Sequence, residues 1–142
     1  MPTIDPYLFF DGNCADAMRF YEKTLGGKLA ALMTYDQSPM KEQCGGPGMK
    51  DRVMHACLAL DGRSLMASDT MTGEPYQGMQ NVSVSLAYPT ADEAKKVFGL
   101  LADGGQVQIP MDKTFWSEAF GVVRDRFGTS WFVGGGAQPT PA

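Results

Sequence analysis

The stretch "NVSVSLAYPTADEAKKVFGLLADGG", residues 81–105, decides the fold, because it joins a strand signal to a complete helix signal. Residues 81–88 alternate apolar and polar side chains, which is typical of a strand with one buried face. Thr90 followed by Glu93 forms a capping box, apolar residues then recur at helical spacing, and a pair of glycines ends the run. The stretch therefore predicts a strand followed directly by an amphipathic helix.

The same order of elements occurs twice along the chain. After this helix, runs rich in β-branched and aromatic residues predict strands at 106–111, 119–125 and 130–135. Before it, the sequence predicts a strand at 7–10, a helix at 15–25, and strands at 28–35, 53–60 and 63–68. The βαβββ order thus repeats after about 75 residues, and such a duplication can bring two half-open sheets around a ligand-sized space.

Composition limits the class of protein. A chain of 142 residues suits one ordinary domain, and its net charge of -4 argues against a nucleic-acid partner, which needs clustered Lys and Arg. The N-terminal residues lack a signal-peptide pattern, and no apolar run is long enough to span a membrane. We therefore expect a soluble, cytoplasmic protein with no membrane partner.

Cysteine and histidine are too few for a disulfide framework or a Cys/His zinc site. The chain has three Cys, no CxxC pair and one His, so reduced thiols are expected. The loop at 36–50 is rich in Gly, Pro and Met, and we consider it a candidate lid.

Three segments together resemble a known superfamily. They are "PYLFFDGNCADAMRFYEKTLGG" (6–27), "MHACLALDGRSLMASD" (54–69) and "KTFWSEAFGVVRDRFGTSWFV" (113–133). In order and spacing they resemble the vicinal oxygen chelate superfamily, which includes glyoxalase I, extradiol dioxygenases and bleomycin- and fosfomycin-resistance proteins. More narrowly, they resemble its PhnB-like branch.

The resemblance implies an α+β fold in which two tandem βαβββ modules form a curved mixed or antiparallel sheet around a cup-shaped cavity. It implies one domain over 1–136, with modules at about 3–69 and 81–135, and we expect a flexible tail at 137–142. It also implies a homodimer.

Enzymes of the superfamily hold a divalent metal with His, Gln or Glu on four strands. Carried over to this chain, those positions are Pro6, Met66, Phe132 and either Val82 or Ser83. None offers an imidazole or a carboxylate, so we expect no metal at the superfamily's usual place and no other cofactor. The alternative is a divalent metal at a relocated site around His55, Asp69 or Glu118.

Alternation along the strands assigns the side chains that would line the cup. The expected ligand-binding residues are His55, Cys57, Met66, Ser68, Asp69, Ser83, Ser85, Trp116, Phe120 and Phe132. Val82, Val84 and Leu86 are expected to pack under the helix instead, and Trp131 is expected in the core.

His55 is the candidate catalytic residue, since imidazole is the side chain that exchanges protons near neutral pH. A half-buried His bonded to a backbone carbonyl is the alternative. Asp69 either orients His55 or receives a cationic ligand, or is only a turn residue that ends its strand. Cys57 and His55 stand roughly 7 Å apart at i and i+2 on one strand, too far for a catalytic dyad.

Four functions are compatible with these patterns. The first is binding of a small apolar or aromatic molecule in a metal-free cup. The second is a metal-dependent lyase, transferase or dioxygenase with the relocated site. The third is a dimerising module with an empty cup. Relatives of the branch sometimes carry a demethylubiquinone methyltransferase label, but the chain has no Gly-rich strand-to-helix turn for S-adenosylmethionine, so we reject that activity.

Overall fold

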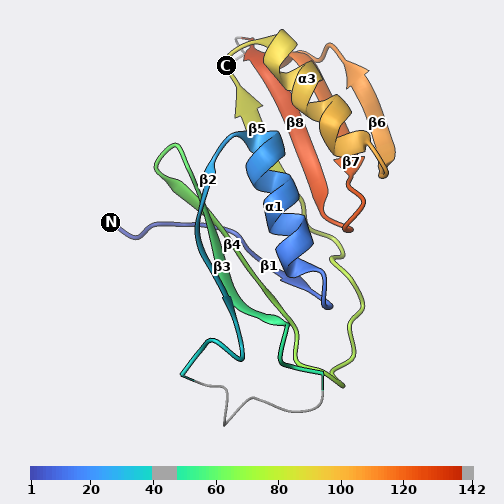
Figure 1. The fold of residues 1–142 in the computed structure, drawn as a ribbon. Coiled ribbons are helices and arrows are strands. Elements are labelled where there is room, and N and C mark those ends of the chain that lie inside the picture. The colour runs from blue at the N-terminus through green and yellow to red at the C-terminus, as the bar shows by residue number, and fades with distance from the viewer. Residues whose placement is uncertain (40–47, 139–142) are drawn as a thin grey trace. The chain divides into compact units, whose positions relative to one another are not determined.

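The structure, a computed structural model, describes residues 1–39 and 48–138 and separates the chain into two units, Met1–Gly78 and Met79–Ala142. Each unit contains one βαβββ module with one helix and one four-stranded sheet. The expected α+β fold with a duplicated module is therefore confirmed (Figure 1). Most of the candidate lid, residues 40–47, lies outside the described residues.

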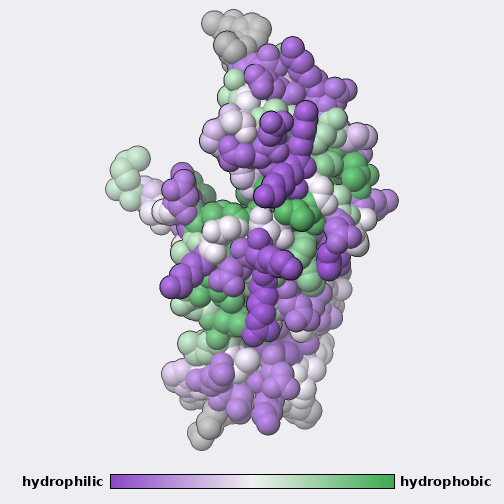
Figure 2. All heavy atoms as spheres, turned by 45° about the horizontal axis from the view of Figure 1, so that its top comes forward, coloured by the Kyte–Doolittle hydropathy of each residue, from purple (hydrophilic) through white to green (hydrophobic). Residues whose placement is uncertain are grey.

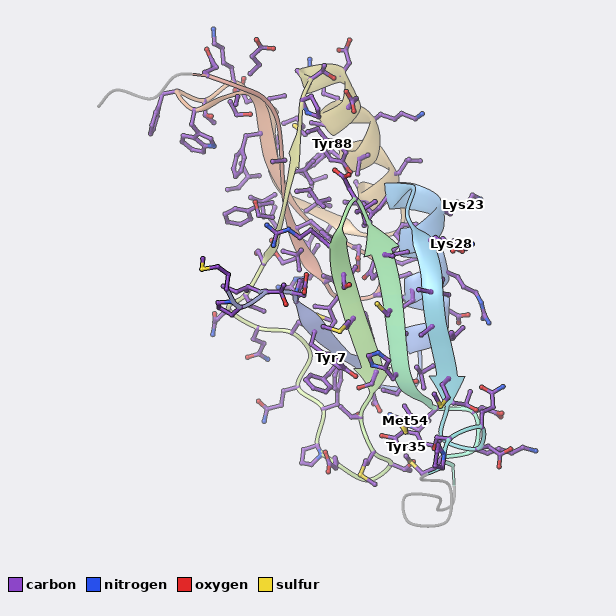
Figure 3. The ribbon with its side chains drawn as sticks, turned by 90° about the vertical axis from the view of Figure 1, so that its left-hand side faces the viewer. Tyr7, Lys23, Lys28, Tyr35, Met54 and Tyr88 are labelled. Carbon is purple, nitrogen blue, oxygen red and sulfur yellow. The ribbon has the colours of Figure 1, made fainter. Side chains whose placement is uncertain are left out.

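The first unit is a mixed sheet covered on one face by a single helix. Its elements are β1 (Tyr7–Phe10), α1 (Cys14–Leu25), β2 (Lys28–Thr34), β3 (Val53–Leu60) and β4 (Arg63–Asp69). The strand order is β1-β4-β3-β2, in which β1 runs parallel to β4 and the other neighbours are antiparallel. Helix α1 packs on β2, β3 and β4, and among the described residues of this unit no helix packs on the opposite face, which we call the helix-free face (Figure 3).

The second unit repeats this topology. Its elements are β5 (Val84–Tyr88), α3 (Ala91–Ala102), β6 (Gln106–Asp112), β7 (Ser117–Arg124) and β8 (Ser130–Ala137). The strand order is β5-β8-β7-β6, again with a parallel pair at one edge, β5 with β8. Helix α3 packs on all four strands and buries its predicted apolar stripe, Ala94, Val97, Phe98 and Leu101.

A pair of glycines follows the helix in both units, and the two glycines of each pair serve different purposes. Gly26 and Gly104 have φ of +85° and +76°, a left-handed backbone that favours glycine where the chain leaves the helix. A side chain at Gly27 would collide with the backbone of β3, and one at Gly105 would collide with Arg124 and Asp125. The repeated pair therefore provides both the helix stop and the close approach of the returning strand.

Two sequence expectations need correction at the ends of the second module. Val82, expected under the helix, is 60% exposed, because Asn81 adopts a left-handed φ of 60° and β5 begins only at Val84. Residues 137 and 138, expected in a flexible tail, are ordered instead, since β8 continues through Ala137 and the Gln138 side chain donates to two backbone carbonyls. Residues 139–142 lie outside the described residues. Glycine in β8 allows the strand to pack closely against the start of α3, because a side chain at Gly135 would collide with Thr90 and Ala94.

The surface mixes both kinds of residue, with hydrophilic residues prevailing on the face shown in Figure 2. Several large apolar side chains nevertheless reach solvent in each unit, among them Phe9 in the first and Phe115 in the second. Within the described part of the chain, no helix has the length and apolar character needed to cross a membrane.

Candidate functional site

The helix-free face of the first sheet carries four of the predicted site residues. His55 and Cys57 on β3 are half-buried, whereas Ala56 and Leu58 between and beyond them are fully buried against the helix side. The strand register places Met66 of β4 opposite Cys57, and Ser68 alternates with Ala67 onto the same face as Met66. The predicted alternation of this hairpin is therefore confirmed, and these side chains share one surface.

Tyr7 joins His55 on this face. The phenol oxygen of Tyr7 lies 3.1 Å from Nδ1 of His55, and the two ring centroids are 5.8 Å apart. Tyr7 belongs to β1 and is paired with Met66 of β4, so its side chain reaches across β4 to β3. Figure 3 looks onto this face, with β4, β3 and β2 in front of α1 and Tyr7 labelled beside them.

Asp69 has a different surrounding from the one expected. Its side chain alternates onto the helix side of β4, is 2% exposed, and accepts three backbone hydrogen bonds, from Gly12 (2.7 Å), Cys14 (3.0 Å) and Val53 (2.8 Å). His55 lies on the opposite face and bonds to Tyr7, so the hypothesis that Asp69 orients His55 is wrong. Instead, the carboxylate ties the first turn of α1 to the start of β3.

The two described cysteines are free thiols in contrasting surroundings. Cys57 is half-buried on the helix-free face, whereas Cys14, the first residue of α1, is fully buried. Burial and then the nearby charge of Asp69 raise the pKa of the Cys14 thiol to about 12. Cys14 is therefore a protonated, unreactive core residue at neutral pH.

A row of aromatic rings runs from the loop between β6 and β7 onto the face of the second sheet opposite α3. Consecutive centroid distances are 4.7 Å from Phe115 to Trp116, 5.2 Å from Trp116 to Phe120, and 5.5 Å from Phe120 to Phe132. All three pairs meet edge to face, the geometry that aromatic quadrupoles prefer. Three of the four rings are well exposed: 69% for Phe115, 40% for Trp116 and 41% for Phe132. We call these four residues the aromatic row.

Serines border the aromatic row. Ser85 of β5 is paired with Phe132 of β8 in the parallel register, so the two side chains are neighbours on one face. Ser83 precedes β5, and its hydroxyl lies 2.7 Å from that of Ser130. Because either oxygen of this pair can donate, the serines provide hydroxyl groups beside the rings.

Trp131 is buried as expected, on the opposite face from Phe132. Its indole N–H donates to Oδ2 of Asp125 at 2.8 Å, and it is fully buried under the helix. The other carboxylate oxygen of Asp125 accepts from the backbone of Phe127 and Thr129. Trp116 and Trp131 therefore have separate roles, one at the surface and one in the core.

The inherited metal positions do not fit a metal. Pro6, Met66 and Phe132 present no imidazole or carboxylate, and the hydroxyl of Ser83 is bonded to Ser130. The relocated set is also dispersed: His55 and Asp69 lie on opposite faces of one sheet, and Glu118 is an exposed residue of the other unit. Within residues 1–39 and 48–138, no three His, Cys, Asp or Glu side chains are grouped closely enough to hold a metal ion.

Sequence reasoning missed Tyr7 as a member of the first of these surfaces. Alternation in "YLFF" already separates Tyr7 and Phe9 from the buried Leu8 and Phe10. However, the pairing of β1 with β4, which brings Tyr7 within reach of His55, depends on long-range topology. The sequence pattern alone had no signal for that contact.

Comparison with solved structures identifies the class of protein. A glyoxylase/bleomycin resistance protein/dioxygenase domain from Frankia sp. EAN1pec has a TM-score of 0.64 at 12% identity, over 97% of both chains. Protein PA1353 from Pseudomonas aeruginosa has a TM-score of 0.88 at 41% identity, over 95% of this chain and 98% of that one. The fold is that of the vicinal oxygen chelate superfamily.

Within this class, residues 2–134 match the family described as 3-demethylubiquinone-9 3-methyltransferase, and the chain belongs to that family. Protein YjdN of Escherichia coli (strain K12) is 32% identical over 139 residues, which cover 92% of each chain. A Bacillus cereus structure described as a putative 3-demethylubiquinone-9 3-methyltransferase, PhnB protein, has a TM-score of 0.78 at 27% identity, over 94% of this chain and 99% of that one. The expected PhnB-like branch is thus confirmed.

Proposed function

We propose that this PhnB-like protein binds a small, uncharged aromatic molecule on the aromatic row of its second unit, without using a metal. The observation that carries the proposal is the exposure of three rings of the row: Phe115 and Trp116 in the loop before β7, and Phe132 on the sheet face opposite α3. Leaving that much apolar surface in water is unfavourable, and a planar ligand that covers it gains hydrophobic and ring-stacking free energy.

The polar surroundings of the row favour an uncharged ligand. Arg124 lies on the same face of β7, but its guanidinium already donates to the carbonyls of Met79 and Gly128. The strand register places serine hydroxyls beside Phe132, and they orient a ligand by hydrogen bonds without demanding charge. The exposed carboxylate of Glu118, on the same face of β7 as Phe120, disfavours an anionic ligand. An aromatic body with one hydroxyl or ether oxygen matches this combination.

A direct test is equilibrium dialysis of the purified protein against 1-naphthol, an aromatic compound with one hydroxyl. We expect saturable binding that Trp116→Ala and Phe132→Ala each weaken by about fivefold or more. Leu100→Ala removes a 43% exposed apolar side chain from α3, which covers the opposite face of the sheet, and it is expected to change the affinity by less than about twofold. Equal affinity in all four proteins would overturn the proposal.

The two tryptophans provide a second readout. In a proton NMR titration with 1-naphthol, the indole N–H signal of Trp116 is expected to shift, whereas that of Trp131, buried and bonded to Asp125, stays in place. A shift of the Trp131 signal alone would argue against binding at the row.

The name of the family describes a methyl transfer, which our proposal does not include. Each sheet has only one parallel strand pair, at an edge, and the turns that enter the helices read "DGN" and "PT". Neither turn has the Gly-rich sequence that usually holds S-adenosylmethionine in a parallel α/β sheet.

The proposal also includes a homodimer in solution, and sedimentation equilibrium tests it.

A further inference from the structure

The single histidine of the chain is held in place by a residue from a distant strand. Tyr7 and His55 are 48 positions apart and belong to β1 and β3, which are separated by β4. A side-chain hydrogen bond between two partly exposed rings restricts the rotation of both. Rings that are already restricted lose less conformational entropy when a ligand binds, so the pair is preorganised.

The second ring nitrogen of His55 is available to a ligand. Nδ1 is engaged by Tyr7, and among residues 1–39 and 48–138 no side chain or backbone group is bonded to Nε2. Every buried side-chain nitrogen or oxygen in that part of the chain has a partner, so Nε2 is in contact with solvent. When the phenol donates to Nδ1, neutral imidazole carries its proton on Nε2 and presents an N–H donor.

The groups around the pair are uncharged. Phe9, 54% exposed, has its ring centroid 5.3 Å from that of Tyr7. Cys57 and Met66 on the same face add sulfur, and Ser68 adds a mostly buried hydroxyl. Among the described residues, those that the strand register places beside His55 and Tyr7 include no Lys or Arg that would bind a carboxylate or phosphate, whereas a neutral carbonyl needs only one donor and an apolar surface.

We propose that Tyr7 and His55 form a second small-molecule site, in the first unit, which binds a neutral carbonyl compound. The Nε2–H group of His55 donates to the carbonyl oxygen, and the ring of Phe9 contacts the apolar body of the ligand. Tyr7 is a positioning residue, because it holds the imidazole ring and its tautomer. This site goes beyond the aromatic row and uses none of its residues.

The test compares two ligands that differ in one atom group. Acetophenone has a carbonyl, and α-methylstyrene has the same shape with a methylene group in place of the oxygen. Each is titrated into ¹⁵N-labelled protein while the imidazole signals are followed, which need no assignment because the chain has one His. We expect acetophenone to shift the Nε2 signal saturably and to bind about fivefold more tightly than α-methylstyrene.

Two variants separate positioning from direct contact. His55→Phe keeps a flat ring without nitrogen, and it is expected to abolish the preference for acetophenone over α-methylstyrene. Dialysis measures this in proteins that also carry Trp116→Ala, so that binding at the aromatic row contributes little. Tyr7→Phe keeps the Phe9 contact, and it is expected to weaken acetophenone binding by about fivefold. Without the phenol, both imidazole tautomers are expected to be populated, which moves the Nδ1 and Nε2 signals toward each other in the ¹⁵N spectrum.

The proposal is overturned if wild-type protein binds both compounds equally, or if His55→Phe retains the preference. The ligand comparison in wild-type protein needs no variant, so a misfolded variant does not affect it. Trp116→Ala serves as the control for the other site. It is expected to leave the acetophenone shift of His55 unchanged, even though it weakens binding of 1-naphthol.

Discussion

The two sheets of this protein share a topology but not a surface chemistry. In both sheets the strands of the module lie in the order first, fourth, third and second. The first and fourth strands are parallel, and one helix packs on one face. The helix-free face of the first carries an imidazole, a phenol and a thiol, whereas that of the second carries the aromatic row and serine hydroxyls. The buried face therefore determines the fold of each βαβββ module, whereas the side chains on the helix-free face can differ.

A second likeness lies in the cores, where each unit buries one aspartate. Asp69 and Asp125 are 2% and 4% exposed, and each accepts at least three hydrogen bonds. Asp69 bonds only to backbone groups of distant segments, whereas Asp125 closes a local turn and holds the indole of Trp131. The first unit thus depends on a long-range polar contact where the second uses a local one.

The largest expected effect comes from removing the long-range contact. Asp69→Ala leaves three backbone N–H groups without their acceptor, and we expect a loss of about 4 kcal/mol in the free energy of unfolding. Urea denaturation measures it. Asp103→Ala, at a side chain 81% exposed in a surface ion pair, is the matched control and should change stability by less than about 0.5 kcal/mol. Similar losses in both variants would show that Asp69 has no special structural role.

Replacing each tryptophan separately compares the stability contributed by a core and a surface residue of the second unit. Trp131→Phe removes a buried bond to Asp125 and leaves a cavity, so we expect a loss of about 3 kcal/mol in the free energy of unfolding. Trp116→Phe keeps an apolar ring at a 40% exposed position and should cost less than about 0.5 kcal/mol. A costly Trp116→Phe would mean that the aromatic row stabilises the fold.

Local patterns account for most of the fold that the sequence predicted. Hydrophobic period, turn residues and the glycine pairs placed the eight strands and two helices found in residues 1–39 and 48–138, because each signal lies within a few neighbouring residues. The start of β5 was wrong because the left-handed backbone of Asn81 has no strong signature in that context. The predicted end of β8 was two residues too early because Ala137 pairs with Ser117 at the start of β7, a contact between strands that the local sequence does not reveal.

The candidate sites were only partly predictable for the same reason. Alternation placed His55 and Cys57 on one face and separated Trp131 from Phe132, since a strand has a period of two. It could not show that Asp69 would bind the backbone of three distant residues, or that Tyr7 would meet His55. Both contacts join segments far apart in sequence, and their ligand-binding roles remain predictions.

The buried thiol of the first unit gives a pH-dependent prediction. The pKa of Cys14 is about 12 in the folded chain against an ordinary value of 9.0, so above pH 9 the unfolded chain loses a proton that the folded chain keeps. Stability is therefore unaffected below pH 9 and falls by up to about 1.4 kcal/mol per pH unit from there to about pH 12.

Urea denaturation of wild-type protein and Cys14→Ala between pH 8 and about pH 10.5 measures this slope. Other groups titrate equally in both proteins, so the difference between the two slopes belongs to Cys14. Parallel slopes would mean that the thiol is more accessible to water than its complete burial indicates.

The smallest expected change in the free energy of unfolding comes from the residues that cap the N-termini of the two helices. Thr90 accepts a hydrogen bond from the backbone of Glu93, whereas Asn13 makes no side-chain cap bond and the start of α1 is bonded to Asp69 instead. We therefore expect Thr90→Ala to cost about 1 kcal/mol and Asn13→Ala less than about 0.3 kcal/mol by urea denaturation. If Asn13→Ala cost as much as Thr90→Ala, α1 would depend on its local cap and the contrast between local and long-range capping would fail. A small loss at Asn13 beside a large one at Asp69 is the pattern expected when a distant strand holds the helix start.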